Sequence, residues 1–433
     1  MWPPTKRSTR CRRCWARRRP IRRSVRAWRP PAPRSRRCRR KSPRFCRPIS
    51  AYLWGSIVSM AIDWTISRRG LFSGSFAALA GGYLGLGDAQ GRAPGANVTP
   101  EFISAVRIAG TDGGARLTKD GLAPFALPGR AHAPLRLDGN RIALIGRRPG
   151  SFAAIFDSVG IDEGEPARIF TPTAGRRFAG HAGVSPDGAT LVTSEIDAET
   201  GDGFVVMRDA ASAAPKAVFP VGIEPHDLLF ARGGDRLVVA IGGIAHAADV
   251  KGPALNAGRI ESSIVEIAPG TGAVLKRHAL PADGKSLSLR HMALAPDGET
   301  IVFGMQDQDR SQQRPLLGVL HVGRGLELLP LPEEAGALRS YIGSVAIDVS
   351  GRFAAATSPK GGTVGLWRLA DGRALPGFRL ADVCGLAPGA APGAFWVTSG
   401  HGDVVALEAG DAGFETRAHW RAEAAFDNHL LKL

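Results

Sequence analysis

Five histidines and one cysteine recur at corresponding places between residues 132 and 429. Three of the histidines stand six residues before the aspartate of an Asp-Gly dipeptide: His132 before Asp138, His181 before Asp187 and His291 before Asp297. The other members of the series are His226, Cys384 and His429. Imidazole nitrogens are typical ligands of iron, copper and zinc, and a thiolate favours the softer ions. If these side chains converge, the sequence predicts a transition-metal site.

Charged residues accompany this series. Glu224 and Asp227 flank His226, Arg290 directly precedes His291, and Asp427 stands two residues before His429. Glu195 and Asp197 follow a predicted strand, and we expect them on a loop that joins the same site. These carboxylates and the arginine are the predicted polar support of the metal-binding residues.

The elements that must position these side chains are short strands rich in β-branched and small apolar residues, separated by Gly, Asp and Pro. Six turn dipeptides follow one another about 42 to 63 residues apart, which is the length of a four-stranded propeller blade. They are Asp138-Gly139, Asp187-Gly188, Gly233-Gly234, Asp297-Gly298, Ser350-Gly351 and Pro392-Gly393. The widest gap contains a loop over 242–261, a natural place for a functional insertion.

A pair of strands follows each turn, beginning at residues 141, 190, 236, 300, 352 and 394. A seventh blade can be assembled from both ends of the body, with strands in 101–109 and 115–127 and an innermost strand in 426–433. The predicted fold is therefore all-β, a seven-bladed β-propeller of four-stranded antiparallel blades, closed by N- and C-terminal strands in one blade. Inner strands line the axis of such a fold, so the histidines would meet there.

Three interpretations of the histidines stay open. They could hold a metal, or Arg130 and Arg290 could instead hold an anion. The third interpretation is structural, because histidines near blade junctions can bond to backbone groups and lock neighbouring blades together. Cys384 alone is also typical of a small buried apolar residue.

The charge of the chain is concentrated at its N-terminus. Residues 1–60 hold 20 of the 56 Lys+Arg and none of the 39 Asp+Glu, so the remainder carries 36 cations against 39 carboxylates. The formal net charge of +17 therefore does not indicate a nucleic-acid-binding body. Residues 1–59 are Arg/Pro-rich, without hydrophobic periodicity, and we interpret them as a disordered extension that a misplaced start codon has added. The Cys11–Cys14 pair lacks the second pair of a zinc site.

Residues 60–91 have the order of an export signal. Met60 precedes Arg68-Arg69, which resembles the twin-arginine (Tat) consensus, and an uncharged Ala- and Gly-rich run follows. This run is too short to span a membrane. Small residues predict cleavage near Gly91, so we expect Tat-translocase-dependent export, a periplasmic location and a mature propeller over 92–433.

From Ser67 to Leu433 the chain resembles the bacterial propeller family called domain of unknown function 1513. The resemblance rests on Arg147-Arg148-Pro149-Gly150, Gly180-His181, Gly222-Ile223-Glu224-Pro225-His226, Arg290-His291, Tyr341-Ile342-Gly343-Ser344-Val345, Ala356–Gly362 and Phe426-Asp427-Asn428-His429-Leu430. That family is grouped with YVTN-type and quinoprotein amine dehydrogenase β-chain-like propellers. Its genes tend to lie beside imelysin-like iron-uptake genes, which implies periplasmic iron-uptake proteins as partners.

These observations predict a periplasmic binding module, which binds a metal or docks a partner in iron acquisition. One alternative is a lactonase-like enzyme that uses a channel-bound metal as Lewis acid, with Glu195 or Glu224 as general base. The other alternative is an interaction scaffold with structural histidines. No GxSxG, Walker A or HExxH motif is present, so we expect a binding protein rather than an enzyme.

Overall fold

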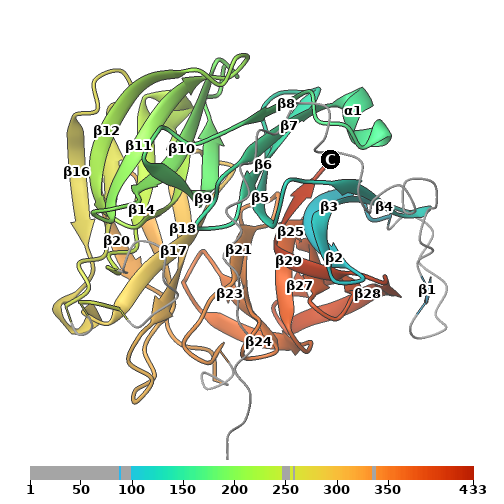
Figure 1. The fold of residues 1–433 in the computed structure, drawn as a ribbon. Coiled ribbons are helices and arrows are strands. Elements are labelled where there is room, and N and C mark those ends of the chain that lie inside the picture. The colour runs from blue at the N-terminus through green and yellow to red at the C-terminus, as the bar shows by residue number, and fades with distance from the viewer. Residues whose placement is uncertain (1–86, 89–98, 246–253, 257–258, 334–337) are drawn as a thin grey trace, which may run out of the picture. The chain divides into compact units, whose positions relative to one another are not determined.

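The computed structural model describes residues 87–88, 99–245, 254–256, 259–333 and 338–433 (Figure 1). The strands of these residues form seven antiparallel sheets around a ring, which is a seven-bladed β-propeller. Six sheets have four strands, and the seventh carries the additional short strand β1 (Gly87–Asp88) at its outer edge. The predicted fold class is confirmed.

The blades follow the order of the chain, and within each blade the innermost strand is given first. The closing blade contains β29 (Ala425–Lys432), β2 (Phe102–Ile108), β3 (Thr111–Thr118) and β4 (Gly121–Ala126). The second blade contains β5 (Ala131–Arg136), β6 (Arg141–Gly146), β7 (Ala153–Asp157) and β8 (Arg168–Phe170). The third contains β9 (Arg176–Val184), β10 (Thr190–Asp197), β11 (Asp202–Asp209) and β12 (Pro215–Ile223). The fourth contains β13 (Pro225–Ala231), β14 (Arg236–Ile241), β15 (Ser263–Ile267) and β16 (Val274–Ala279). The last three are β17 (Leu287–Leu294), β18 (Thr300–Asp307), β19 (Leu317–His321) and β20 (Gly325–Leu328); β21 (Ser344–Ile347), β22 (Phe353–Ser358), β23 (Thr363–Arg368) and β24 (Ala374–Arg379); β25 (Val383–Pro388), β26 (Ala394–Ser399), β27 (Asp403–Gly410) and β28 (Gly413–Arg421).

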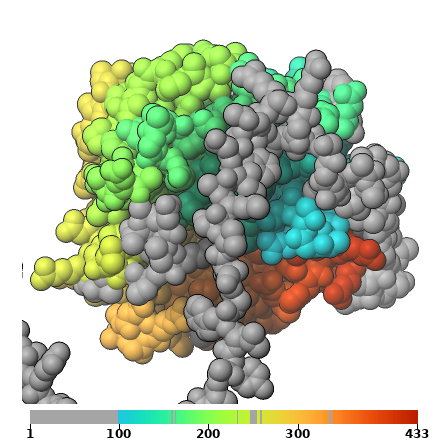
Figure 2. Space-filling view, viewed as in Figure 1, coloured from blue at the N-terminus to red at the C-terminus, as the bar shows by residue number. Residues whose placement is uncertain are grey.

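The ring is closed by strands from both ends of the body. β29 pairs antiparallel with β2, with Phe102 opposite Lys432. Figure 2 shows the cyan N-terminal and red C-terminal segments side by side on the same face. The closing blade therefore has the composition that the sequence predicts, and its terminal strand edges are paired.

The turn dipeptides lie where the sequence places them. Gly188 and Gly298 have φ values of 71° and 70°, a left-handed conformation that glycine adopts without strain. The exceptions to the β pattern in the described residues are the short helix α1 (Ser158–Glu163) and two 3-10 turns, η1 (Arg232–Gly234) and η2 (Ala282–Gly284). Of the predicted loop over 242–261, residues 246–253 and 257–258 lie outside the described part of the chain.

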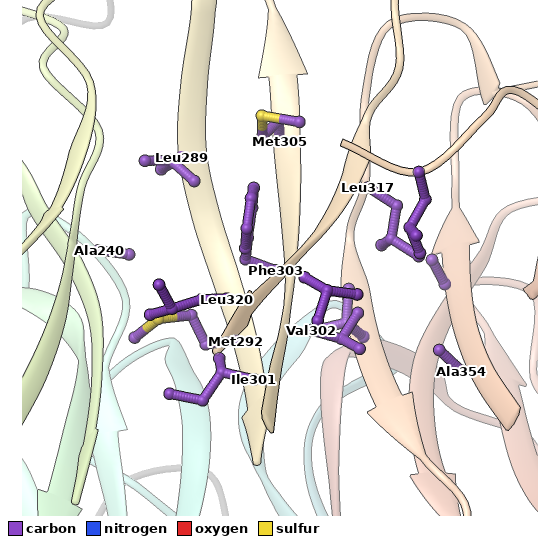
Figure 3. Packing of buried hydrophobic residues seen from close by; sticks show 14 of the residues in the cluster. Ala240, Leu289, Met292, Ile301, Val302, Phe303, Met305, Leu317, Leu320 and Ala354 are labelled. Carbon is purple, nitrogen blue, oxygen red and sulfur yellow. The ribbon is translucent and has the colours of Figure 1, made fainter. Parts of the chain in front are cut away.

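The apolar core lies between the blades (Figure 3). Ala240, Phe303 and Ala354 belong to three neighbouring blades and are all fully buried in one cluster. Both faces of the middle strands are covered, which explains why β18 is an almost continuous apolar run instead of an alternating one.

The seven inner strands surround the axis, and each contacts the next around the ring. They run in the same direction. β5 and β29 contact each other through Arg130 and Asp427 near their beginnings and through Arg136 and Lys432 near their ends. Residues that precede an inner strand, or follow the antiparallel second strand, therefore share one end of the channel, which we call the entry end.

Candidate functional site

The inner strands bring all five predicted histidines together on the axis. His132, His181, His226, His291 and His429 come from five different blades. The ring centroids of eight pairs among them are separated by 4.6 to 6.2 Å. Two triads offer ligand atoms that all lie within 4.8 Å of one another, His132/His181/His429 and His181/His226/His291. We call these five residues the histidine cluster.

Each of the five inner strands that carry a histidine has a β-bulge at the level of that histidine. On β5 the pairing with β6 shifts between Ala131 and Pro134, around His132. The register also shifts around His181, His226, His291 and His429. A bulge removes a residue from the ladder and redirects its side chain. These five irregularities therefore accompany the convergence of the imidazoles at one level of the axis.

The cluster is held in its neutral form. His132, His181 and His291 are buried, whereas His226 and His429 are partly buried. Burial lowers the pKa of all five imidazoles, and for His181, His226 and His291 the neighbouring histidines and arginines lower the pKa further. A neutral imidazole carries one N–H and one lone pair, so each ring can bind a cation through one nitrogen.

Asp427 fixes the orientation of His132. The Nδ1 atom of His132 lies 2.9 Å from Oδ1 of Asp427, and a carboxylate can only accept. Nη1 of Arg147 also approaches Nδ1, at 3.3 Å, but the carboxylate is nearer. Nδ1 therefore carries the proton, and the lone pair of His132 lies on Nε2. Arg130 and Arg147 also donate to Asp427, at 2.7 Å each. Burial alone would raise the pKa of Asp427, but the contacts with His132, Arg147 and Arg130 hold it below its usual range.

The opposite tautomer applies to His226. Nη1 of Arg290 lies 3.1 Å from Nδ1 of His226, and a guanidinium can only donate. The lone pair of His226 is therefore on Nδ1, and Nε2 carries the proton. Arg290 and Arg148 also donate to the buried carboxylate of Glu224, which accepts the backbone N–H of Ile244 at 3.0 Å as well. Burial opposes ionisation of Glu224, yet the two arginines lower its pKa.

Four imidazole nitrogens remain without a hydrogen-bond partner within the described residues. They are Nε2 of His181, His226 and His429 and Nδ1 of His291. Nδ1 of His181 lies 3.4 Å from Oδ1 of Asp227, and burial raises the pKa of Asp227 to about 7. Buried polar atoms are normally paired, so several unpaired imidazole nitrogens at one place indicate a site for a ligand.

A cavity of about 400 Å³ adjoins the cluster on the side away from the entry end. His181, His291 and His429 belong to its wall, together with Asp227. The remaining wall is mostly apolar and is formed by the later residues of the inner strands, including Leu294, Ile347 and Leu431. A small molecule in this cavity would contact the imidazoles directly.

Three predicted site residues lie outside the cluster. Glu195 is fully buried one strand outward, in β10, where its carboxylate accepts from Arg208 at 2.5 Å. Asp197 accepts backbone N–H groups of its own turn, at Glu199 and Thr200. Both residues therefore belong to the end of strand β10 instead of a loop, and their carboxylates bond to local partners instead of the histidine cluster.

Cys384 is also on an inner strand, but it belongs to neither triad among the described residues. Its Sγ donates to the carbonyl of Phe426 at 3.2 Å, and burial raises the pKa of the thiol. A thiol with a raised pKa is a weak source of thiolate. The position fits a small buried residue between two blades.

Sequence reasoning missed Arg147 and Arg148 as members of the site. They follow β6, which is antiparallel to β5, and therefore reach the entry end beside His132 and Glu224. The sequence did contain a signal for both arginines. The segment Arg147-Arg148-Pro149-Gly150 follows the second strand of its blade, and the end of a second strand lies beside the beginning of an inner strand.

The expectations for residues 1–59, for the Tat signal at Arg68 and Arg69, and for cleavage near Gly91 lie outside the described residues. Within the described residues, the structure has no helix with the length and apolar character needed to cross a membrane.

Comparisons with known proteins agree with this architecture. Residues 125–433 match the model of the family described as "Protein of unknown function (DUF1513)". A similar solved structure is the Kuenenia stuttgartiensis hydrazine synthase, with a TM-score of 0.51 and 12% identity over 71% of this chain and 96% of that chain. At that identity the likeness concerns the fold alone. No curated protein matches the sequence. Because the family model covers all blades except the first strands of the closing one, the chain belongs to the DUF1513 family of β-propellers.

Proposed function

We propose that this propeller binds one transition-metal ion at the histidine cluster. The observation that carries the proposal is the convergence of five neutral imidazoles, four of which have a nitrogen without a partner among the described residues. A purely structural role would leave these nitrogens bonded to backbone groups, as buried polar atoms normally are.

The tautomers favour one of the two triads. His132 presents the lone pair of Nε2, because its Nδ1–H is held by Asp427. A carboxylate–histidine pair of this kind is the usual support of a metal ligand. His226 presents an N–H at Nε2, because its Nδ1 accepts from Arg290. His132, His181 and His429 are therefore the proposed ligands, with His291 as a neighbour and His226 as a hydrogen-bond donor.

The donor set fits the ions that bind imidazole. Three histidines are a common protein set for zinc, and imidazole also suits copper and iron. Affinity should follow the general order of divalent ions, with Cu²⁺ bound more tightly than Zn²⁺ and Zn²⁺ more tightly than Fe²⁺. The cavity beside His181, His291 and His429 supports an accessible site that can take a further ligand. Periplasmic export and a role in iron acquisition remain predictions from the sequence and from the family resemblance.

The test is a zinc and copper titration of the EDTA-treated full chain by calorimetry. Cys11 and Cys14 are replaced by serine, because a CxxC pair can itself take zinc. We expect one ion per chain, and we expect loss of binding in His181→Asn, since His181 belongs to both triads. His226→Asn should still bind one zinc per chain, because His226 is not among the proposed ligands.

Two histidines away from the cluster provide the matched control. His321 and His401 lie outside the histidine cluster, and His321→Asn/His401→Asn should bind zinc like the parent. Thermal unfolding in EDTA shows whether each variant is folded. A folded His181→Asn protein that still binds one zinc per chain at the parent affinity would exclude the proposed site.

A further inference from the structure

A second cavity, of about 480 Å³, lies at the entry end between the blades of β17–β20 and β21–β24. Its wall comes from the loop after β18, the loop before β21 and the loop after β22. The charged lining residues are Asp307, Arg310, Arg314, Arg339 and Lys360. We call this cavity the basic pocket. It shares no residue with the histidine cluster.

The basic pocket has more cations than carboxylates. Arg314 is neutralised, because it donates to Asp307 at 2.9 Å and to Asp309 at 3.2 Å. No ion pair to a carboxylate is found for Arg310, Arg339 or Lys360 within the described residues. This local excess contrasts with the chain after residue 60, in which carboxylates slightly outnumber cations.

The backbone and an aromatic ring hold two of these cations in place. Arg339 and Ser340 have φ values of 41° and 58°, a region that non-glycine residues rarely adopt. The carbonyl of Ser340 accepts the backbone N–H of Asp307 at 2.9 Å, which fixes this turn to the end of β18. Nζ of Lys360 lies 4.9 Å from the centroid of the Tyr341 ring.

Lys360 is solvent-exposed at the basic pocket and lies near other cations. Partial burial lowers the pKa of Lys360, and the charges of Arg310 and Arg290 lower it further. The hydroxyl of Tyr341 accepts from Asn428 at 3.1 Å, so the ring under Lys360 is itself attached to the closing strand. Like charges that the fold keeps close together are stabilised when an anion binds between them.

We propose that the basic pocket binds a small oxyanion with at least two negative charges, such as a polycarboxylate or phosphate. Guanidinium groups bind the oxygens of both ion classes in a bidentate manner, and an ammonium adds a point charge. The pocket lies at the same end of the channel as Arg290 and the other arginines near the cluster. The proposal does not depend on a metal, because none of the lining residues belongs to the histidine cluster.

Calorimetric titration of the EDTA-treated full chain with citrate and with phosphate tests this proposal, in a buffer that contains sodium chloride. The pocket variant is Arg339→Asn/Lys360→Gln, in which asparagine tolerates the left-handed backbone. The control variant is Lys119→Gln/Arg324→Gln. It removes the same charge from side chains that are 67% and 75% exposed and that do not line the pocket.

We expect one anion per chain, bound at least tenfold more weakly by the pocket variant and within twofold of the parent by the control. If the pocket variant loses citrate binding, the ligand of the pocket is a polycarboxylate. If it loses phosphate binding alone, the ligand is a phosphate. The proposal is overturned if neither anion binds, or if the control loses as much affinity as the pocket variant. The exposed Arg310→Gln change provides a second, milder variant if the double variant does not fold. The same variants should bind zinc with the affinity of the parent. A loss of anion binding can therefore be distinguished from a failure of the proposed metal site.

Discussion

Replacing Asp427 by asparagine tests both the fold and the proposed metal site. The carboxylate is 4% exposed and bonds to His132, Arg130 and Arg147. Asparagine has nearly the same shape but cannot carry the negative charge that these three donors share. We expect lower stability without metal and, separately, lower affinity for metal.

The stability loss follows from the exposure of the partners. Removal of one member of a fully buried ion pair costs about 3–5 kcal/mol. Arg130 and Arg147 are 46% and 34% exposed, so water replaces part of their lost contacts, and we expect about 1–3 kcal/mol. The unfolding entropy of a domain of about 330 residues is roughly 0.7 kcal/mol/K, so the Tm should fall by about 1–4 °C.

The affinity loss follows from the tautomer of His132. An amide can present either its oxygen or its NH2 to Nδ1, so the tautomer of His132 is no longer fixed, and such a change typically weakens metal binding about 10–100-fold. Zinc competition with a chromophoric chelator measures the affinity, and thermal unfolding in EDTA measures the stability.

The matched control is Asp403→Asn. This carboxylate also contacts a histidine, with Nε2 of His419 at 3.0 Å, but neither residue belongs to the cluster. Parent-like zinc affinity in Asp427→Asn would refute the reasoning, and so would an equal loss in Asp403→Asn.

Three further predictions concern the fold around the site. Glu195→Gln should cost about 3–5 kcal/mol in thermal unfolding, because it leaves the 3%-exposed Arg208 without a counter-charge, while zinc affinity measured by titration should be unchanged. Phe303→Ala should cost about 3–5 kcal/mol through the cavity it leaves between the blades, and Phe303→Leu should cost less in the same urea unfolding experiment. Asp348 is buried, and burial would raise its pKa, but bonds from Ser350 and from the backbone of Phe353 and Gly393 lower it. The ionised carboxylate of Asp348 therefore stabilises the fold above the unfolded-state pKa, and this stabilisation is lost as the pH falls below it. Between about pH 5 and pH 3, the Tm of the parent should fall more steeply than that of Asp348→Asn.

Much of the fold could be predicted from local chemistry. The strand Arg236–Ile241 begins where the sequence predicts, because Gly233-Gly234-Asp235 precede it and Gly242-Gly243 follow it. Closure was also predictable, since β2 and β29 would each leave an unpaired edge without the other.

The candidate site was predicted in its residue types but not in its connections. The equal spacing of His132 and His181 from their turns indicated a common level on the axis. Glu195 could not be placed, because the sequence does not show that Arg208 on the next strand reaches it. Cys384 lies at a bulge of β25 like the bulges at His132 and His291, yet its thiol donates to a neighbouring carbonyl. Side-chain partners across strands depend on register, which spacing alone does not determine.

Closure by β29 also gives the site an order of assembly. The closing strand supplies both His429 and Asp427, whereas the other four histidines precede it by more than a hundred residues. During synthesis, six blades can form while the triad that includes His429 is still incomplete. The proposed ion would therefore be captured only after β29 has been made and has paired with β2. A ribosome-bound chain arrested before residue 425 should accordingly fail to retain zinc.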